Sequence, residues 1–496
     1  MHVLSAFRND FYGIFPELFL TLTTFCILLF GVFFSTSRSN GFPLLSANVS
    51  HLGLLSLVGT FLLTLHMPFS ISICFCHAII IDEFALFFKS IILISACAAI
   101  LVSMEYVQKT MLNVFEYTIL ILFSTLSMLF MISSYDFVSM YLAIEMQSLC
   151  FYVLTASKRQ SEFSTEAGLK YFVLGALSSG LLLFGASFIY GSTGITNFED
   201  ISKCLAGSSA FTDRNTMVHI GLVLISIGFL FKLTAAPFHF WAPDVYEGAP
   251  FSVTAFFAIA PKIAIIGVLI RLLLGSFYDF LFEWQTLLVL CSVASLLIGS
   301  FGAIAQKKIK RLIVFSSVGH VGYMLIGLSC GTLEGIHSVL FYVCIYVLMT
   351  VNVFAVLLSV QDNQSKPIKY IQDLGLLSQT QPLLAFTLSC TLFSMAGIPP
   401  LAGFCSKLYL FFAAISASFY GLALLGVLCS VVSCFYYLRM IKIMYFEQPS
   451  TYITIQSLDR MKATIIAITS FGIIFLFVFP TSLFLSTYLI AMSFAG

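Results

Sequence analysis

Long apolar runs separated by short polar segments make up most of this sequence, and no other feature limits its fold as strongly. A membrane-spanning helix needs about 20 mainly apolar residues. Counted between charged residues, Gly and Pro, the sequence holds fourteen runs of this kind: 13–34, 51–67, 79–103, 117–134, 136–156, 168–190, 218–241, 250–274, 285–305, 312–330, 335–360, 381–414, 417–445 and 462–493. We therefore predict an all-α polytopic membrane protein with about 14 transmembrane helices.

The composition excludes several other classes of protein. Only 9% of the 496 residues are charged and 60% are apolar, whereas about 25% of the residues in soluble domains are charged. The 23 basic and 22 acidic residues leave a net charge of +1, so we expect no nucleic-acid partner. Outer-membrane barrels are excluded because their short alternating strands do not give long unbroken apolar runs. We expect the first run to be a retained helix rather than a cleaved signal peptide, because no A-x-A cleavage site follows it.

We expect this chain itself to bind no cofactor and no metal. Its 13 cysteines lie singly or as the pair Cys74 and Cys76, without the C-x-x-C spacing of zinc and iron–sulfur sites. The sequence contains neither a P-loop nor a G-x-G-x-x-G motif for nucleotides. We expect the cysteines to be buried free thiols that pack as small apolar side chains.

The distribution of basic residues predicts the orientation of the chain. With the N-terminus outside, loops on the inner side carry 14 basic residues: Arg38, Lys109, Lys158, Arg159, Lys307, Lys308, Lys310, Arg311, Lys366, Lys369, Arg439, Lys442, Arg460 and Lys462. The outer side carries only four, which are Arg8, Lys203, Arg214 and Arg271. Because inner loops of membrane proteins are enriched in Lys and Arg, we expect both termini to face outside.

Five lysines remain, and all of them lie within apolar runs: Lys89, Lys170, Lys232, Lys262 and Lys407. A lysine at membrane depth costs a few kcal/mol even on the lenient insertion scale, so each is a functional candidate. Lys89 shares a helical face only loosely with Asp82 and Glu83, and for it we expect a structural ion pair at most.

Glu145 and Lys232 are the candidate proton-carrying pair of the first half. Glu145 lies in the middle of its run, and Tyr141, Ser148 and Tyr152 share its helical face. Lys232 precedes Pro237, which should interrupt the helix within two turns of the lysine. The alternatives are a carboxylate that only fixes helix packing and a structural kink with a snorkelling lysine.

Three further residues are candidates for proton transfer. Lys262 follows Pro261 in the middle of its run, and His320 lies in the middle of the tenth run. Histidine titrates near neutral pH, which suits a proton relay, and a hydrogen-bonded core histidine is the alternative. Lys170 begins the sixth run, where a snorkelling interfacial lysine is the alternative.

Lys407 repeats the pattern of Lys232 in the second half of the chain. As one helix, the run 381–414 would be about 51 Å long, whereas the apolar core of a membrane is about 30 Å thick. Pro399 and Pro400 therefore predict a break close to Lys407. Broken helices in the seventh and twelfth positions predict two inverted five-helix repeats. The predicted segments are 1–116 with three N-terminal helices, 117–274 with helices 4–8, 285–445 with helices 9–13, and 446–496 with helix 14.

Five stretches of the sequence resemble a known family: Met140–Tyr152, Ser164–Tyr171, Phe231–Gly248, Ile309–Leu312 and Ala396–Phe404. They are similar to the antiporter-like membrane subunits of proton-pumping NADH:quinone oxidoreductase, or respiratory complex I. The similarity covers most of the chain and is most specific between residues 136 and 440. The three N-terminal runs are similar to the long form of one such subunit in plants and algae, whereas animal versions lack them.

The resemblance implies fourteen helices with two inverted repeats, and it implies roles for the candidate residues. Glu145 and Lys232 would form the ion pair of the first half, Lys262 would be the central relay, and Lys407 would be the terminal lysine of the second half. Lys170 and His320 would line the same hydrated axis. The chain would be a multi-pass protein of the mitochondrial inner membrane with both termini in the intermembrane space.

The implied activity is proton translocation coupled to quinone reduction elsewhere in the complex, so this enzyme subunit would hold no redox centre. The complex would use NADH, FMN, iron–sulfur clusters and ubiquinone. The implied partners are the other membrane-arm subunits, including sibling antiporter-like chains, and lipids. A subunit of a multisubunit cation–proton antiporter is the main alternative, because it shares the core and its charges. A solute transporter and a structural scaffold are further alternatives, and the buried lysines argue against the scaffold.

Overall fold

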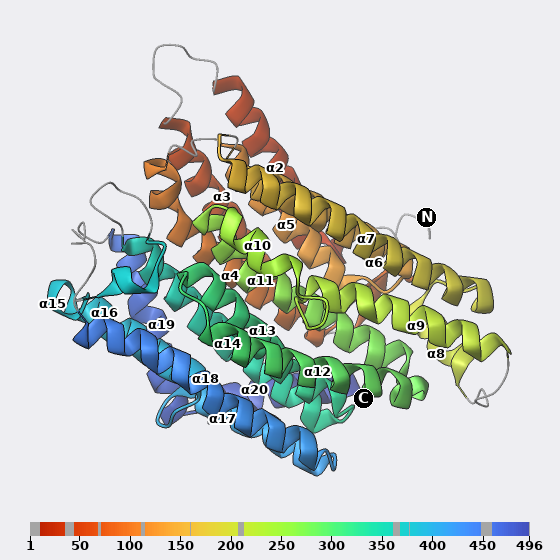
Figure 1. The fold of residues 1–496 in the computed structure, drawn as a ribbon. Helices are drawn as coiled ribbons and strands as arrows, with labels where there is room; N and C mark the ends of the chain where they lie inside the picture. The colour runs from red at the N-terminus through yellow and green to blue at the C-terminus, as the bar shows by residue number, and fades with distance from the viewer. Residues whose placement is uncertain are drawn as a thin grey trace. The chain divides into compact units, whose positions relative to one another are not determined.

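The computed structural model describes residues 10–34, 44–67, 71–110, 115–158, 160–206, 213–360, 368–375, 377–447 and 459–495. Long helices dominate it (Figure 1), and twelve helices in the described ranges are long and apolar enough to cross a membrane. They are α2 (Phe15–Phe34), α3 (Leu44–Leu65), α4 (Glu83–Lys109), α5 (Glu116–Ser133), α6 (Phe137–Thr155), α7 (Glu162–Thr193), α11 (Phe251–Ile270) with its π-helical continuation η1 (Arg271–Ser276), α12 (Leu281–Ile304), α13 (Ile309–Ser329), α14 (Leu333–Ser359), α18 (Tyr420–Phe446) and α19 (Arg460–Val478). The prediction of a polytopic helical membrane protein is thereby confirmed.

Many Ser and Thr hydroxyls in these helices donate to a carbonyl of their own helix. Thr125 in α5 donates its hydroxyl to the Leu122 carbonyl at 2.8 Å, and Thr350 in α14 donates to the Tyr346 carbonyl at 2.8 Å. Such bonds to the preceding turn remove the cost of an unpaired hydroxyl in an apolar environment. Ser and Thr can therefore lie inside membrane-spanning helices without interrupting them.

The first of two compact units comprises Met1–Ile100, Met111–Leu233 and Ala260–Trp284. Within it, α7 lies along α9 (Asp213–Lys232) (Figure 1), and α5 packs against α2, α3 and α6. Gly185 of α7 and Gly221 of α9 lie where these helices meet. A Cβ on either glycine would lie 2.7 or 2.8 Å from the carbonyl oxygen of the other, so only glycine permits this approach.

The second compact unit comprises Leu101–Thr110, Thr234–Ile259 and Gln285–Gly496. Its centre is α14, which packs against α13, α16 (Pro382–Ala396), α17 (Ala402–Ser416), α19 and α20 (Thr481–Ala495). The short helix α10 (Trp241–Gly248) packs against α13. The remaining short helices of the described chain are α8 (Phe198–Leu205), η2 (Tyr278–Phe280), η3 (Ile371–Leu374) and α15 (Leu377–Thr380).

Two of the expected runs do not form one continuous helix. In the run 218–241, α9 ends at Lys232 and α10 begins only at Trp241, with Thr234 at a positive φ of 63° between them. In the run 381–414, α16 ends at Ala396, Gly397 caps it at a φ of 87°, and α17 begins at Ala402. Both interruptions contain proline, which removes a backbone donor and crowds the preceding turn.

A third run, 462–493, is also divided, although we expected one helix there. Helix α19 ends at Val478 and α20 begins at Thr481, with Pro480 between them. Both helices pack against α14. The expectation of a continuous fourteenth helix is therefore wrong, because Pro480 cannot donate the hydrogen bond that would continue α19.

The prediction of an all-α chain is wrong in one short segment. Strands β1 (Ser72–Cys74) and β2 (Ile79–Ile81) form an antiparallel hairpin ahead of α4, in the register Ser72 with Ile81. The three isoleucines that begin the run 79–103 are β-branched and favour a strand. Asp82 then accepts a hydrogen bond from the Ala85 backbone N–H at 2.8 Å, so α4 begins after the strand.

Candidate functional site

Lys232 is the last residue of α9. Its ammonium group interacts electrostatically with the carboxylate of Glu145 on α6. Both side chains are half-buried. Ser148, one turn along α6, donates its hydroxyl to Glu145 Oε2 at 3.1 Å. Oε1 of Glu145 is buried and has no hydrogen-bond partner among the described residues. The carboxylate therefore keeps one oxygen available to a proton or a water molecule.

The polar stripe predicted around Glu145 is present in the structure. The Tyr141 hydroxyl interacts with the Glu145 carboxylate, and Tyr152 lies two turns along the same helix. The Tyr152 hydroxyl lies 2.2 Å from the position that a Cβ on Gly175 of α7 would occupy. Gly175 therefore makes the room that lets this tyrosine lie between α6 and α7.

Lys262 lies in α11, which continues as a helix through Pro261. Only 2% of the lysine is exposed. Lys262 is thus a buried ionisable side chain within a membrane-spanning helix, as the sequence predicts.

Lys170 lies on an exposed surface of α7 rather than inside the first unit. Its ammonium group pairs with the Glu166 carboxylate one turn earlier at 2.7 Å, and 44% of the lysine side chain is exposed. Its place on a hydrated axis stays a prediction, and its geometry suits the interfacial alternative.

Lys407 is buried in α17, where its Nζ donates to the carbonyls of Met395 and Ala396, each at 2.9 Å. These two residues end α16, so the interrupted segment supplies carbonyl oxygens that a continuous helix would keep for itself. The ammonium group also lies 4.9 Å from the centre of the Tyr323 ring, which adds a cation–π contact. The break and the lysine thus form one local structure.

His320 lies in the middle of α13 and is 3% exposed. Its Nδ1 lies 2.6 Å from the Tyr342 hydroxyl and its Nε2 lies 3.2 Å from the Tyr437 hydroxyl. The two tyrosines come from α14 and α18, so three helices meet at this imidazole.

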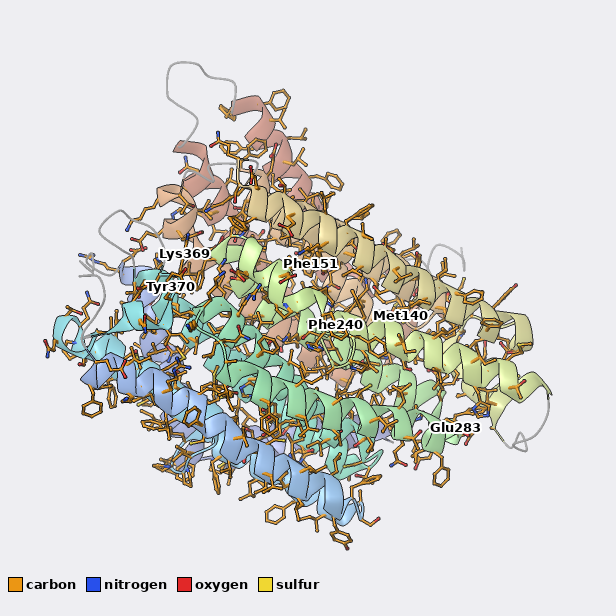
Figure 2. The ribbon with its side chains drawn as sticks, viewed as in Figure 1. Met140, Phe151, Phe240, Glu283, Lys369 and Tyr370 are labelled. Atoms are coloured by element: carbon orange, nitrogen blue, oxygen red, sulfur yellow. The ribbon has the colours of Figure 1, made fainter. Side chains whose placement is uncertain are left out.

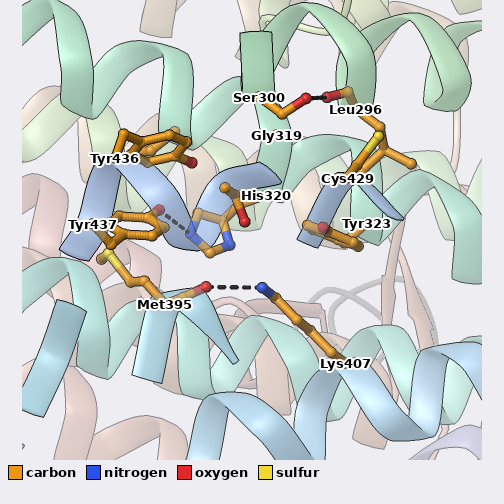
Figure 3. A pocket seen from close by; sticks show the side chains of 12 residues that line it. Leu296, Ser300, Gly319, His320, Tyr323, Met395, Lys407, Cys429, Tyr436 and Tyr437 are labelled. Carbon is orange, nitrogen blue, oxygen red and sulfur yellow. Dashed lines mark hydrogen bonds between the residues drawn. The ribbon is translucent and has the colours of Figure 1, made fainter. Parts of the chain in front are cut away.

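His320 and Lys407 line the same cavity in the second unit (Figure 3). Its volume is about 10 Å³, which is about the space that the centre of one water molecule requires. The other lining residues are Leu296, Ser300, Ser316, Gly319, Tyr323, Met395, Cys429, Ser433, Tyr436 and Tyr437. None of these tyrosines was predicted to be functional from the sequence. The spacing of Ser316, His320 and Tyr323 on one face of α13 was the available signal.

A cluster of ion pairs joins two of the stretches that carry the family resemblance. Lys308 and Arg311, at the start of α13, both pair with Glu247 of α10, and Arg311 Nη2 lies 3.1 Å from Asp244 Oδ1. Lys310 donates to the Ala249 carbonyl at 2.5 Å. These contacts fix the helix of His320 against the segment that follows Lys232 in the chain. In that segment His239 is buried and stacks on the exposed Phe240, which is labelled in Figure 2.

Several charged residues have buried partners that the sequence did not reveal. Lys89 of α4 pairs with Glu17 of α2 at 2.5 Å, so the structural ion pair considered for this lysine is present, with a partner other than Asp82 or Glu83. Asp82 pairs instead with the buried Arg271 at 2.8 Å. Lys462, which was expected in an inner loop, is fully buried in α19 and contacts Glu105 at 2.5 Å. In each case the partner lies far away in the sequence.

The described residues contain no group of three or more His, Cys, Asp and Glu side chains that could hold a metal ion. The cysteines are free thiols. The prediction that they are buried is wrong for three of them, Cys26, Cys76 and Cys204, which lie on surfaces of the described chain. Among the inner-side basic residues, Arg38, Arg159 and Lys366 lie outside the described residues, and so does Arg8 on the outer side.

Comparison with known proteins identifies matches over the whole chain. Residues 134–433 match the family model described as "NADH:quinone oxidoreductase/Mrp antiporter, TM". The chain is 54% identical to "NADH-ubiquinone oxidoreductase chain 2" of Marchantia polymorpha over 98% of this chain and 99% of the relative. This relative agrees with the resemblance to the long plant form.

Two solved structures extend the comparison to the fold. A chain of respiratory complex I from Thermus thermophilus superposes with a TM-score of 0.79 at 27% identity, over 95% of this chain and 98% of that one. A chain of the Mrp complex from Dietzia has a TM-score of 0.80 at 19% identity, over 98% and 97%. The second likeness concerns the fold alone.

Proposed function

Because the chain belongs to the transmembrane family shared by NADH:quinone oxidoreductase and the Mrp antiporter, we propose that it is a proton-translocating subunit in the membrane arm of NADH:ubiquinone oxidoreductase. The observation that carries this proposal is Lys407. Its ammonium group is buried at a helix interruption, is held by two carbonyls, and shares a water-sized cavity with His320. A packing residue needs no such cavity, whereas a proton carrier does.

In this proposal the chain crosses the membrane fourteen times. Twelve crossings are the long apolar helices of the described chain. The other two are broken helices, one formed by α9 with α10 and one formed by α16 with α17. The broken helices would occupy the seventh and twelfth positions of two inverted five-helix repeats, and both termini would face the intermembrane space.

Protons would move through the buried ionisable groups of the two halves. Burial favours the neutral amine of a lysine, and a nearby carboxylate favours the ammonium form. A change in the distance between Glu145 and Lys232 would therefore load or release a proton. Lys262 would pass it on, and His320 and Lys407 would carry it in the second half. For Lys170 the support is weaker, because the lysine lies on an exposed surface.

The redox reaction would take place in other subunits, which would hold FMN and iron–sulfur clusters and would react with NADH and ubiquinone. The partners of this chain would be the other membrane-arm subunits, including sibling antiporter-like chains, together with lipids of the mitochondrial inner membrane. The name of the Marchantia relative favours this assignment over a cation–proton antiporter. Purification with flavin and iron–sulfur subunits would support it, and cation transport without them would support the antiporter.

The functional test is the substitution Lys232→Met in the intact complex. It keeps length and apolar bulk but removes the titrating group, so NADH-driven quinone reduction and proton pumping should fall together by about 100-fold, the range of a lost acid–base group. Glu145→Gln should have the same effect, and Lys232→Arg should also impair pumping because a guanidinium stays protonated. The control is Lys203→Met, since this lysine is exposed in α8. An assembled Lys232→Met complex that pumps at the normal rate would reject the carrier role.

A further inference from the structure

The two ring nitrogens of His320 face different surroundings. Tyr342, on the Nδ1 side, is fully buried, and its hydroxyl has no other hydrogen-bond partner among the described residues. Tyr437, on the Nε2 side, lines the cavity that also contains Lys407 (Figure 3). Nδ1 thus faces a buried phenol, whereas Nε2 faces a tyrosine that lines a space large enough for water.

This asymmetry determines the tautomer of the neutral imidazole. A buried phenol must give its proton to an acceptor, and for Tyr342 that acceptor is Nδ1 of His320. Nδ1 therefore carries no proton, and the imidazole proton lies on Nε2. The Nε2–H then donates to the oxygen of Tyr437.

The hydroxyl proton of Tyr437 must consequently point away from His320. Ser316 and Tyr436 interact with the Tyr437 hydroxyl, and both also line the cavity. The cavity has room for about one water molecule, and Lys407 lines it together with Tyr437 (Figure 3). One water there would connect the Tyr437 hydroxyl, and through it Nε2 of His320, with Lys407.

We propose that Tyr437 relays protons between His320 and the cavity at Lys407, and that Tyr342 is a positioning residue that keeps the N–H of His320 directed at Tyr437. The transfer starts from His320 with a proton on both ring nitrogens, so that the Tyr342 oxygen accepts from Nδ1–H. The Nε2 proton then passes to the Tyr437 oxygen while the Tyr437 proton passes to the cavity water. A proton of that water passes to the neutral amine of Lys407. One proton has moved, and each intermediate group has gained one and lost one.

This inference rests on the proposed function and adds to it a named route between His320 and Lys407.

The test is Tyr437→Phe in the intact complex, with NADH-driven quinone reduction and proton pumping measured per assembled complex. Loss of the hydroxyl removes the relay but keeps the ring, so we expect both rates to fall at least tenfold, a conservative value for a lost proton-transfer group. The matched control is Tyr346→Phe. The Tyr346 ring also lies beside His320, at 5.5 Å between centroids, but its hydroxyl donates to the Ala258 carbonyl. We expect this control to lose less than twofold.

Tyr342→Phe separates positioning from packing. Without the phenol, His320 can adopt either tautomer, so we expect a loss of about threefold in rate and a changed solvent deuterium isotope effect on turnover. A packing defect would lower the amount of assembled complex and leave the isotope effect per complex unchanged. Equal rates for Tyr437→Phe and Tyr346→Phe would overturn the relay.

Lys407→Met distinguishes a failure of this inference from a failure of the proposed function. If Lys407→Met abolishes pumping while Tyr437→Phe has no effect, the relay is wrong and the proposed function stands. If Lys407→Met pumps normally, the proposed role of the second half is itself wrong.

Discussion

At the scale of single residues, the charges inside this protein fall into two groups with different surroundings. Lys407 is held by carbonyl oxygens beside a water-sized cavity, with no carboxylate within salt-bridge distance among the described residues. Lys89 and Lys462 are instead held directly by Glu17 and Glu105 at 2.5 Å. The carboxylates supply Lys89 and Lys462 with a countercharge, whereas the carbonyl groups around Lys407 are neutral dipoles. The second arrangement suits transport and the first suits structure.

The structural group leads to a prediction for Glu17. The Lys89 and Glu17 side chains are 3% and 1% exposed, so Glu17→Gln would leave a buried ammonium group without its countercharge. Breaking a buried pair costs about 3–5 kcal/mol. We expect less assembled complex and a lower melting temperature, measured on native gels and by thermal denaturation, with normal pumping per assembled complex.

The double variant Glu17→Gln with Lys89→Met removes both charges and should recover much of the lost stability. Glu199→Gln is the control, since its pair with Lys203 is exposed and should contribute nothing measurable. Equal losses in the single and double variants would show that burial of charge is not the cause.

At the scale of helices, the positions of the candidate residues depend on interruptions and on close packing. Proline and glycine end α16 within reach of Lys407, and α9 ends at Lys232 itself. Glycines then allow neighbouring helices to approach, as between α7 and α9. Proline and glycine thus end helices beside the candidate residues, and glycine also lets the helices that carry these residues pack closely.

Gly185→Ala tests the packing of α7 on α9. The new methyl group would lie 2.7 Å from the Gly221 carbonyl oxygen, so the helices must separate or the backbone must shift. Overpacking of this kind costs about 1–3 kcal/mol. We expect a lower melting temperature and slower turnover per assembled complex, because α9 ends in Lys232.

The control for this variant lies in the same helix. A methyl group added at Gly180 of α7 would meet no atom within 4 Å among the described residues beyond its own stretch of helix, so Gly180→Ala should be neutral or slightly stabilising. Equal melting temperatures for the two alanine variants would show that the α7–α9 contact does not limit stability.

At the scale of the whole molecule, the distribution of charge predicts the sides of the membrane. Most basic residues of the loops lie on one side when fourteen crossings are counted, and an added or lost crossing would mix them. Twelve long helices together with two interrupted ones are compatible with this count. Measuring the orientation of the loops therefore tests whether each interrupted helix pair crosses the membrane once.

Cysteine labelling checks the orientation. Asp200 of α8 and Lys369, which precedes η3 and is labelled in Figure 2, are both exposed. Asp200→Cys should react with a membrane-impermeant maleimide added from the intermembrane-space side, and Lys369→Cys only from the matrix side. Cys26, Cys76 and Cys204 are exposed and must first be replaced by Ser, which provides the unlabelled control. Labelling of both positions from one side would contradict the fourteen crossings.

Much of this protein follows from the sequence alone, because the relevant forces act within short segments. An apolar run of sufficient length forms a membrane-spanning helix whatever its neighbours are, and a charge inside it is costly anywhere. The helical class, the candidate lysines Lys232, Lys262 and Lys407 within apolar runs, and the interruptions near Pro237 and Pro399 were predictable for this reason. The hairpin of β1 and β2 was missed because hydropathy does not distinguish a β-branched strand from the start of a helix. The division at Pro480 was missed because the run 462–493 was taken as one helix by its hydropathy, although a proline lies within it.

Only the tertiary structure determined which side chains meet. His320 lies between hydroxyls that are 22 and 117 residues away in the sequence, and Lys462 contacts a carboxylate 357 residues away. Lys170, predicted by its membrane position, lies on an exposed surface of α7. The sequence shows which charged residues are costly to bury. Which partner offsets that cost depends on how the helices pack.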